Sequence, residues 1–273
     1  MVDEKINWSQ RAIKAAFENF LSIYIGVQTK KRGNNGGSVI RLTDNFLYGK
    51  STLDVIEKDY MKGQGNELTD KMYAIHSSSA LAVNAFSYFN GREKSLVING
   101  KKDFRNIQFE KQLTVGVGSA KANLDIYLES EKEHVFIESK FLEPLGKTKP
   151  IFAEAYRKNG KIVDLIDCFD HLSIVNFMIK HTLAIQNNIQ SYGNKDIFLV
   201  YLYWILENVD EVTSYSYLKY EIEKFKNAYD SLAITKNIKF LSMTYTDLLK
   251  DWSKDTDIYL HADNFRRRYK FTI

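Results

Sequence analysis

The stretch ANLDIYLESEKEHVFIESKF, residues 122–141, places charged side chains at regular positions inside two runs of alternating apolar residues. Successive side chains of a β-strand point to opposite faces of a sheet, so this alternation predicts two strands, over 122–129 and 134–142. The residues between them form a short turn, and the two strands are expected to pair as an antiparallel hairpin.

The polar face of the predicted hairpin carries two acids and a base. If Glu131 and Lys132 are the two turn residues, Asp125 lies directly opposite Glu138, because both are equally far from the turn. Directly opposed residues have Cβ atoms roughly 4.5–5.5 Å apart. Lys140 shares the face of Glu138, since it lies two positions further along the strand. The turn lacks the Asn-Gly pair that would fix this register, so the pairing is inferred from the spacing alone.

Two carboxylates held this close repel each other unless a cation lies between them. Mg²⁺ prefers oxygen ligands, keeps several waters and often binds through one or two carboxylates together with a substrate phosphate. A neighbouring lysine can orient or help to deprotonate the attacking water, and its charge can stabilise the phosphate during attack. Asp125, Glu138 and Lys140 therefore fit metal-assisted hydrolysis of a phosphodiester. They also fit an ordinary half-exposed strand in which Glu138 and Lys140 form a solvated ion pair.

The composition is that of a folded protein of ordinary polarity. The chain has 273 residues, of which 44% are hydrophobic and 26% charged, and its net charge is +4. This mildly basic balance is compatible with a polyanionic partner, but it is common among proteins that bind no nucleic acid. The single cysteine, Cys168, excludes a disulfide within the chain and a cysteine-rich zinc site.

Neither a secretory signal nor a membrane span is expected. The first ten residues, MVDEKINWSQ, contain no apolar run. No stretch of about 18 consecutive apolar residues occurs, which is the length that a membrane-spanning helix needs. We therefore expect a cytoplasmic protein that has no membrane partner.

The other patterns predict helices before and after the hairpin in the sequence. Helical spacing covers 8–28, with Ser9 as the N-cap, and also 69–89, 162–190 and 215–229. Strand-like runs cover 105–115, 196–206 and 238–245. This order predicts an α/β fold with a mixed central sheet flanked by helices. Residues 1–68 are interpreted as an N-terminal helical and loop extension of a core that spans 69–273.

The spacing of the charged residues resembles a known signature. Asp125, followed by Glu138-Ser139-Lys140 with both acids on strands, resembles the D…(D/E)-x-K signature of the PD-(D/E)XK nuclease superfamily. The element order is similar to the αβββαβ core of that superfamily. ANLDIYL, IESKFLEP and FLVYLYW resemble a bacterial group of restriction endonucleases. No proline precedes Asp125 closely, which is a departure that many family members share.

The resemblance implies a restriction-endonuclease-like fold and a Mg²⁺-dependent endonuclease that cuts DNA, with Mn²⁺ as a substitute metal. Asp125 and Glu138 would bind the metal, and the backbone carbonyl of Ser139 would add a ligand. Lys140 would assist the nucleophilic water. Family members often add an acid from the first helix or first strand, and Glu110 in IQFEKQL is the expected one. An exposed strand glutamate is an equal alternative for Glu110.

Several basic residues are candidates for contacts with a nucleic-acid backbone. The segment KKRGNNGGS, residues 30–38, is expected to be a flexible basic loop. Lys30, Lys31 and Arg32 in this loop, together with Arg41, are the candidate nucleic-acid-binding residues. The loop lacks the GxxxxGK[ST] order of a nucleotide-binding loop, and an ordinary solvated loop has the same composition.

Other chemical groups carry weaker signals. The five histidines show no spacing typical of metal ligands, and His76, on the helix predicted before the sheet, is interpreted as a packed residue. Glu143 is a weaker acid candidate, because it precedes Pro144 and would simply end the strand.

Family analogy also implies partners. Cutting both strands of DNA at one site usually needs two active sites, so a homodimer is expected, and a cognate methyltransferase would be a further partner. Two alternatives stay open. One is a nuclease for branched DNA or RNA that uses the same residues. The other is a non-catalytic nucleic-acid-binding protein, against which the presence of both acids and the lysine argues.

Overall fold

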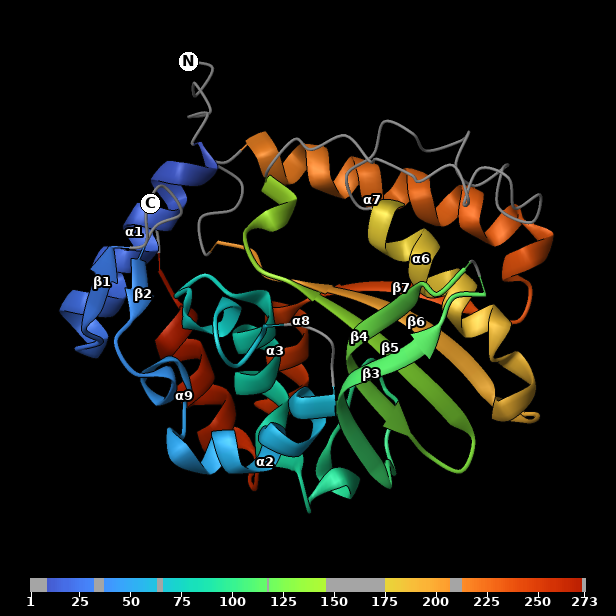
Figure 1. Cartoon of the computed structure of the whole chain (residues 1–273), viewed down its shortest axis with the longest axis horizontal. Coiled ribbons are helices and arrows are strands. Elements are labelled where there is room, and N and C mark those ends of the chain that lie inside the picture. Colours follow the sequence, from blue (N-terminus) through green and yellow to red (C-terminus); the bar gives the residue numbers. More distant parts are fainter. Residues whose placement is uncertain are drawn as a thin grey trace.

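A five-stranded mixed sheet forms the centre of the molecule in the computed structural model (Figure 1). Its strands, in spatial order, are β3 (Asn106–Thr114), β4 (Lys121–Glu129), β5 (Glu133–Lys140), β6 (Asp196–Tyr203) and β7 (Lys239–Thr244). The first three are antiparallel neighbours, whereas β6 runs parallel to β5 and β7 runs parallel to β6. The mixed α/β sheet and all five predicted strands are confirmed.

The structure describes most of the chain. The described residues are 9–31, 37–62, 66–116, 118–145, 175–206 and 213–271. The predicted helix over 162–190 lies partly outside this set, and its described part is α6 (Val175–Asn187).

The register of the β4–β5 hairpin is the predicted one. Ile126 lies opposite Ile137, and Leu128 lies opposite Val135. The turn is fixed by a serine hydroxyl instead of an Asn-Gly pair. The side chain of Ser130 accepts hydrogen bonds from the backbone N–H groups of Lys132 and Glu133, at 3.2 and 3.0 Å. Hydroxyl groups of serine stabilise turns in this way, which explains the register.

Helices cover both faces of the sheet (Figure 1). α6 and α7 (Thr213–Ser231) pack on one face, and α3 (Ser78–Phe86) packs on the other with α8 (Tyr245–Trp252) and α9 (Tyr259–Tyr269) nearby. Two successive residues of β5 illustrate the two sides, because Glu138 contacts α6 while Ser139 contacts α3 and α8. α2 (Lys50–Lys62) packs against the edge strand β3.

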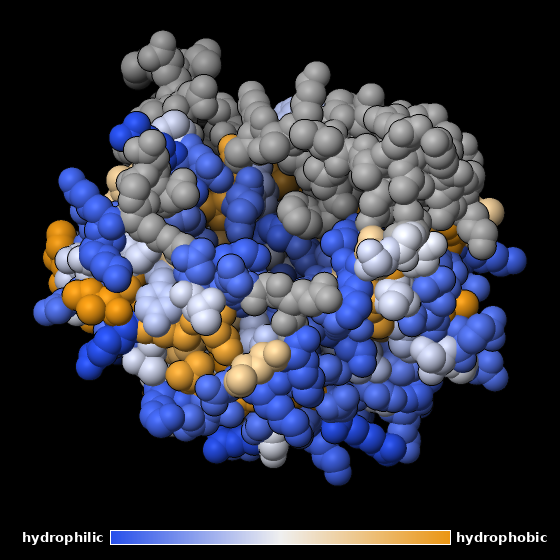
Figure 2. Space-filling model, viewed as in Figure 1, coloured by the Kyte–Doolittle hydropathy of each residue, from blue (hydrophilic) through white to orange (hydrophobic). Residues whose placement is uncertain are grey.

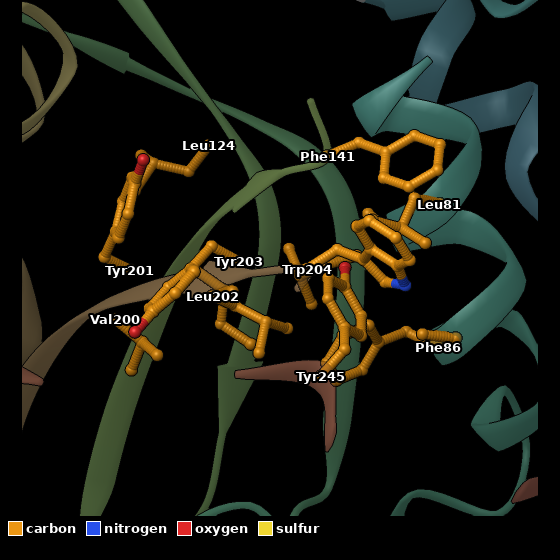
Figure 3. Close-up of a cluster of buried hydrophobic side chains, with 14 of the residues drawn as sticks. Leu81, Phe86, Leu124, Phe141, Val200, Tyr201, Leu202, Tyr203, Trp204 and Tyr245 are labelled. Carbon is orange, nitrogen blue, oxygen red and sulfur yellow. The ribbon is translucent and has the colours of Figure 1, made fainter. Parts of the chain in front are cut away.

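The core on the α3 side is aromatic. Figure 3 shows Phe141 and Trp204, which follow β5 and β6, near Leu81 of α3 and Tyr245 of α8. The rings of Phe141 and Trp204 meet edge to face, with centroids 5.0 Å apart. Pairs of this geometry add roughly 0.5–1.5 kcal/mol beyond the burial of their surface. This packing fixes the carboxyl ends of β5 and β6.

α1 (Gln10–Phe20) attaches the N-terminal segment to the same core. The side chain of Ser9 accepts a hydrogen bond from Ala12 N–H, which confirms the predicted N-cap. Phe17 packs with its ring centroid 5.0 Å from that of Phe141 and 5.9 Å from that of Tyr269. The boundary at residue 69 stays a prediction, but α1 shares its buried contacts with the core beyond that boundary.

Two local predictions near the N-terminus are wrong. The segment 30–38 is not wholly a loop, because β1 (Thr29–Lys31) and β2 (Gly37–Val39) pair as an antiparallel hairpin and β2 is buried. The predicted helix over 69–89 is shorter, since regular α-helix covers only α3. Ala74 is extended and bridges Ser38, and the side chain of Ser77 then caps a new helix by accepting from Ala80 N–H.

α1 and α7 follow the sequence pattern closely, whereas α2, α8 and α9 were not predicted as helices. α1 continues as a π-helical turn over Leu21–Ile25 and ends at Gly26, whose φ of 75° is a left-handed conformation that favours glycine. α7 confirms the predicted helix over 215–229. No helix in the described part of the chain is long and apolar enough to cross a bilayer.

The visible surface is largely hydrophilic. Figure 2 shows a few apolar patches, one of them at the end of the molecule where α1 meets the β1–β2 hairpin. Ile23 and Ile40 are exposed in this region. Scattered exposed apolar side chains are normal for folded proteins.

Candidate active site on β3, β4 and β5

The backbone pairing of β4 and β5 stops at the two predicted acids. Ladder pairing ends where Ile126 lies opposite Ile137. Asp125 and Glu138 are the next residues of β4 and β5, and the charge of Glu138 acts on the pKa of Asp125. Here a side chain replaces the backbone as acceptor, because Ser139 N–H donates to Oδ2 of Asp125 at 2.7 Å. The strands therefore bring the two acids together, as the sequence predicts.

Asp125 is a buried carboxylate with an unfavourable charge environment. Only 8% of the residue is exposed. Burial raises the pKa of Asp125 well above its usual value, and the charges of Glu138 and Glu110 raise it further, against the opposing effects of Lys140 and the Ser139 N–H. An additional cation beside Asp125 would lower this pKa and stabilise the ionised carboxylate.

Glu138 has the opposite environment, because two basic side chains bind its oxygens. Oε1 accepts from Lys140 Nζ at 2.5 Å, and Oε2 lies 2.9 Å from Nε2 of His181 on α6. Burial alone would raise the pKa of Glu138. The charges of Lys140 and His181 and their hydrogen bonds outweigh burial and lower this pKa to about 2.

Lys140 keeps its proton at neutral pH. Burial would lower the pKa of Lys140, but the negative charges of Glu138, Glu143 and Asp125 raise it above the ordinary value. The buried ammonium is therefore a fixed positive charge beside the two acids. Glu143 does not end the strand as interpreted, because β5 ends at Lys140 and Glu143 begins a short 3-10 helix, where its side chain accepts a hydrogen bond from Phe141 N–H at 2.9 Å.

Glu110 joins the same cluster from β3. Its neighbours in the ladder, Phe109 and Lys111, pair with Ile126 and Leu124, which places Glu110 beside Asp125. Glu110 is buried, with 8% exposure, and burial together with the charges of Glu67 and Glu138 raises its pKa to about 7.

The backbone of Glu110 is strained. Its φ is 48°, a left-handed conformation that is uncommon for a residue other than glycine. Phe109, the residue before Glu110, donates its backbone N–H to the carboxylate of Asp59 on α2 at 3.1 Å. Strained residues of this kind persist where surrounding structure fixes them, and they cluster at functional sites.

Two further residues, missed by sequence reasoning, approach the cluster. Glu67 accepts hydrogen bonds from Lys71 Nζ and Ser79 Oγ, at 2.7 and 3.1 Å. The hydroxyl of Tyr60 on α2 is buried without a hydrogen-bond partner among the described residues. Both lie within electrostatic range of Glu110. No pattern marks Glu67, because it stands in a turn outside any periodic segment.

His181 was likewise missed, although its position carried a signal. It lies three residues after Met178 and four before Ile185, on the buried stripe of α6. A histidine inside an apolar stripe needs a polar partner, and that partner is Glu138. His76 lies in the turn before α3, not on a helix as predicted.

The donor chemistry of the cluster fits Mg²⁺, although internal contacts currently occupy it. Asp125 and Glu138 supply the carboxylate oxygens that hard cations prefer. Glu138 uses both oxygens on Lys140 and His181, and Asp125 uses Oδ2 on Ser139. Within the described ranges, no group of three or more His, Cys, Asp or Glu side chains is arranged to hold a metal ion.

The predicted nucleic-acid-binding residues are not brought to the cluster. Lys30 and Lys31 are exposed on β1, which lies beside α1 at one end of the molecule (Figure 1). Arg41 is exposed and forms an ion pair with Asp44 at 3.0 Å. Arg32 lies outside the described residues. A role for these residues in binding stays a prediction.

Comparison with known proteins places the chain in a family. A family model described as restriction endonuclease associating with ARP matches residues 16–270. The chain belongs to this family. The match covers the acidic cluster and most of the helices around it, and it supports a nuclease or a defence role. Membership of the wider PD-(D/E)XK superfamily stays a prediction. No curated protein and no solved structure matches the chain.

Proposed function

We propose that this restriction-endonuclease family member is a Mg²⁺-dependent endonuclease that hydrolyses phosphodiester bonds of DNA in a cytoplasmic, restriction-like defence role. The observation that carries the proposal is the placement of Asp125 and Glu138 side by side where the β4–β5 ladder opens, with Lys140 bonded to Glu138. An exposed strand would leave such charges in solvent, whereas all three residues are buried.

In this proposal Asp125 and Glu138 hold Mg²⁺, for which Mn²⁺ can substitute, and the carbonyl of Ser139 adds a ligand. The bound ion would lower the pKa of a coordinated water and neutralise charge on the phosphate. Glu110 is the third acid. Its pKa of about 7 means that a modest gain of nearby positive charge is enough to ionise it fully.

Lys140 acts through its charge in this scheme. Its raised pKa keeps the ammonium protonated, so the group can orient a water or stabilise negative charge on the phosphate but does not take up a proton. If Lys140 released Oε1 of Glu138 when a metal bound, that oxygen would be fully available as a metal ligand. The ammonium would then be available to the phosphate.

The test is cleavage of supercoiled plasmid with Mg²⁺ or Mn²⁺, with EDTA as the metal-free control. Asp125→Asn, Glu138→Gln and Lys140→Met should each reduce the rate by a factor on the order of 10² or more. Glu129→Gln is the matched control, because Glu129 lies at the far end of β4 in an ion pair with Lys195. Efficient cleavage in EDTA, or unchanged rates in the three variants, would contradict the proposal.

The same assay defines the substrate. Linear duplex, four-way junction and RNA of equal length are compared under one set of conditions, and the proposal expects preference for duplex DNA. Preference for a junction or RNA would assign the same chemistry to another substrate. Salt-dependent binding without hydrolysis of any of them would indicate a non-catalytic protein.

Partners follow from the family. The family description names an association with ARP, and we expect the chain to share that association. A homodimer would supply two active sites for a double-strand cut, and a cognate methyltransferase would protect the host sequence. Light scattering of the purified protein, alone and on DNA, tests the dimer.

A further inference from the structure

The structure contains a buried histidine that contacts the proposed site from outside the strands. His181 of α6 is 3% exposed, and its Nε2 lies 2.9 Å from Oε2 of Glu138. Lys140 binds the other oxygen of the same carboxylate. His181 is therefore the contact that ties Glu138 to the helical layer.

In the hydrogen bond between His181 and Glu138, the donor and the acceptor can be assigned. A carboxylate oxygen accepts hydrogen bonds, so Nε2 of His181 must carry the proton that it shares with Oε2 of Glu138. Nδ1 of His181 is buried and finds no hydrogen-bond partner in the described part of the chain. The imidazole thus uses one nitrogen, and that nitrogen points at Glu138.

α6 provides a rigid base for this contact. Thr182, the next residue, donates to Met178 O at 2.7 Å and lies 3.1 Å from the hydroxyl of Tyr229 on α7. All three residues are buried. The helix is therefore fixed to its neighbour within one residue of His181. Lys140, by contrast, reaches Glu138 through a long side chain with several rotatable bonds.

We propose that His181 is a positioning residue that fixes the carboxylate of Glu138 by holding Oε2, so that Oε1 stays turned toward Lys140 and the reaction. This inference rests on the proposed nuclease function. When Lys140 leaves Glu138 to meet a phosphate, His181 is the partner that keeps the carboxylate in place. Hydrogen bonds that orient a metal-binding carboxylate typically contribute 10–100-fold to metal affinity or activity.

The test compares replacements of similar size at position 181. His181→Gln can place an amide N–H near the position of Nε2, whereas His181→Leu cannot donate. His181→Asn places its amide near Nδ1 and serves if the leucine variant fails to fold. His134→Leu is the matched control, because it removes a buried imidazole of β5 that contacts Tyr127 and the carbonyl of Tyr192 and not Glu138. Thermal unfolding confirms that each variant is folded.

We expect His181→Leu and His181→Asn to lower kcat for plasmid cleavage about 10–100-fold with little change in KM for DNA, and to raise the Mg²⁺ concentration for half-maximal rate. Ca²⁺ binding, measured by calorimetry without DNA, should weaken in parallel. His181→Gln should recover most of both losses, and His134→Leu should retain wild-type values.

Two failures are distinguishable. If the wild type cleaves with Mg²⁺ and Asp125→Asn does not, but His181→Leu and His181→Asn match the wild type, only the positioning role is overturned. Equal damage by glutamine and asparagine overturns it as well, because packing would then be the cause. If the wild type neither cleaves nor binds Ca²⁺, the proposed function fails and the positioning role fails with it.

Discussion

Asp125 and Glu138 lie at opposed positions of neighbouring strands, yet their pKa values move in opposite directions. Burial and the charge of Glu138 raise the pKa of Asp125, whereas the partners of Glu138 overcome burial and lower its pKa to about 2. The two basic partners, Lys140 and His181, both bind Glu138. The pair therefore has one carboxylate with two basic partners and one, Asp125, whose burial is offset only in part by the charge of Lys140 and the N–H of Ser139.

Glu110 should make stability depend on pH. Its pKa rises from 4.5 to about 7, mainly through burial, so the folded protein holds a proton that the unfolded chain has lost between these values. The stability contributed by Glu110 is therefore greatest below pH 4.5 and falls as pH rises toward 7, by on the order of 3 kcal/mol. Urea unfolding at pH 5 and pH 8 should show this fall in the wild type.

Glu110→Gln should remove the share of that fall that comes from Glu110, because the amide does not ionise, whereas Asp125, whose pKa is also raised by burial, contributes in the same direction and is retained. Glu129→Gln is the control, since the hydrogen bond from Lys195 contributes to a lowered pKa of Glu129, in the opposite direction. A fall of equal size in the wild type and in Glu110→Gln would show that another group causes it.

Lys140→Met should destabilise the protein by about 3–5 kcal/mol at pH 7, because it leaves a buried carboxylate short of its main partner. Lys101→Met is the comparison. Lys101 pairs with Glu133 at the opposite end of β5 at 3.0 Å and is only partly buried, so its loss should cost about 1 kcal/mol or less.

The Lys140 effect also has a predicted pH dependence. The stability that Glu138 gains from its lowered pKa is present above the unfolded value of about 4.5 and is lost as pH falls toward 2. The difference between wild type and Lys140→Met should therefore shrink at pH 3. A constant difference from pH 7 to pH 3 would mean that the ion pair does not account for it.

Backbone strain at Glu110 predicts an unusual preference for glycine. Both Glu110→Gly and Glu110→Ala remove the carboxylate, but only glycine adopts a φ of 48° without a steric penalty. The glycine variant should be more stable than the alanine variant by about 1 kcal/mol. In an ordinary strand position the alanine variant would be the more stable of the two. The sign of the difference in stability therefore shows whether the backbone at position 110 is strained.

Tyr60→Phe should stabilise the protein by about 1 kcal/mol, because the hydroxyl of Tyr60 is buried with no partner among the described residues. Tyr245→Phe is the matched control. It removes a buried hydroxyl that lies 2.7 Å from Oγ of Ser139, and so it should destabilise by a similar amount. Destabilisation by Tyr60→Phe would show that its hydroxyl is satisfied in solution.

The site could be predicted from the sequence where local rules decide. Alternation along 122–141 is a property of neighbouring residues, so it predicted the strands, their faces and the register that brings Asp125 near Glu138. The N-cap at Ser9 was equally local.

Contacts between distant segments could not be read in this way. His181 reaches Glu138 from 43 residues away, and Glu67 approaches Glu110 from a turn without periodicity. The late start of α3 follows from a β-bridge between Ala74 and Ser38. The helix propensity of residues 69–89 alone cannot predict this bridge, because Ser38 lies in another segment. Tertiary contacts therefore decided what the local patterns left undefined.

The central claim is that Asp125 and Glu138 together hold a divalent cation. The most direct measurement is anomalous diffraction from crystals soaked in Mn²⁺, for the wild type and for Asp125→Asn. We predict a peak between the two carboxylates in the wild type, with Lys140 moved away from Oε1 of Glu138, and a lost or weakened peak in the variant. A wild-type protein that cuts DNA while showing no metal between Asp125 and Glu138 would contradict the account.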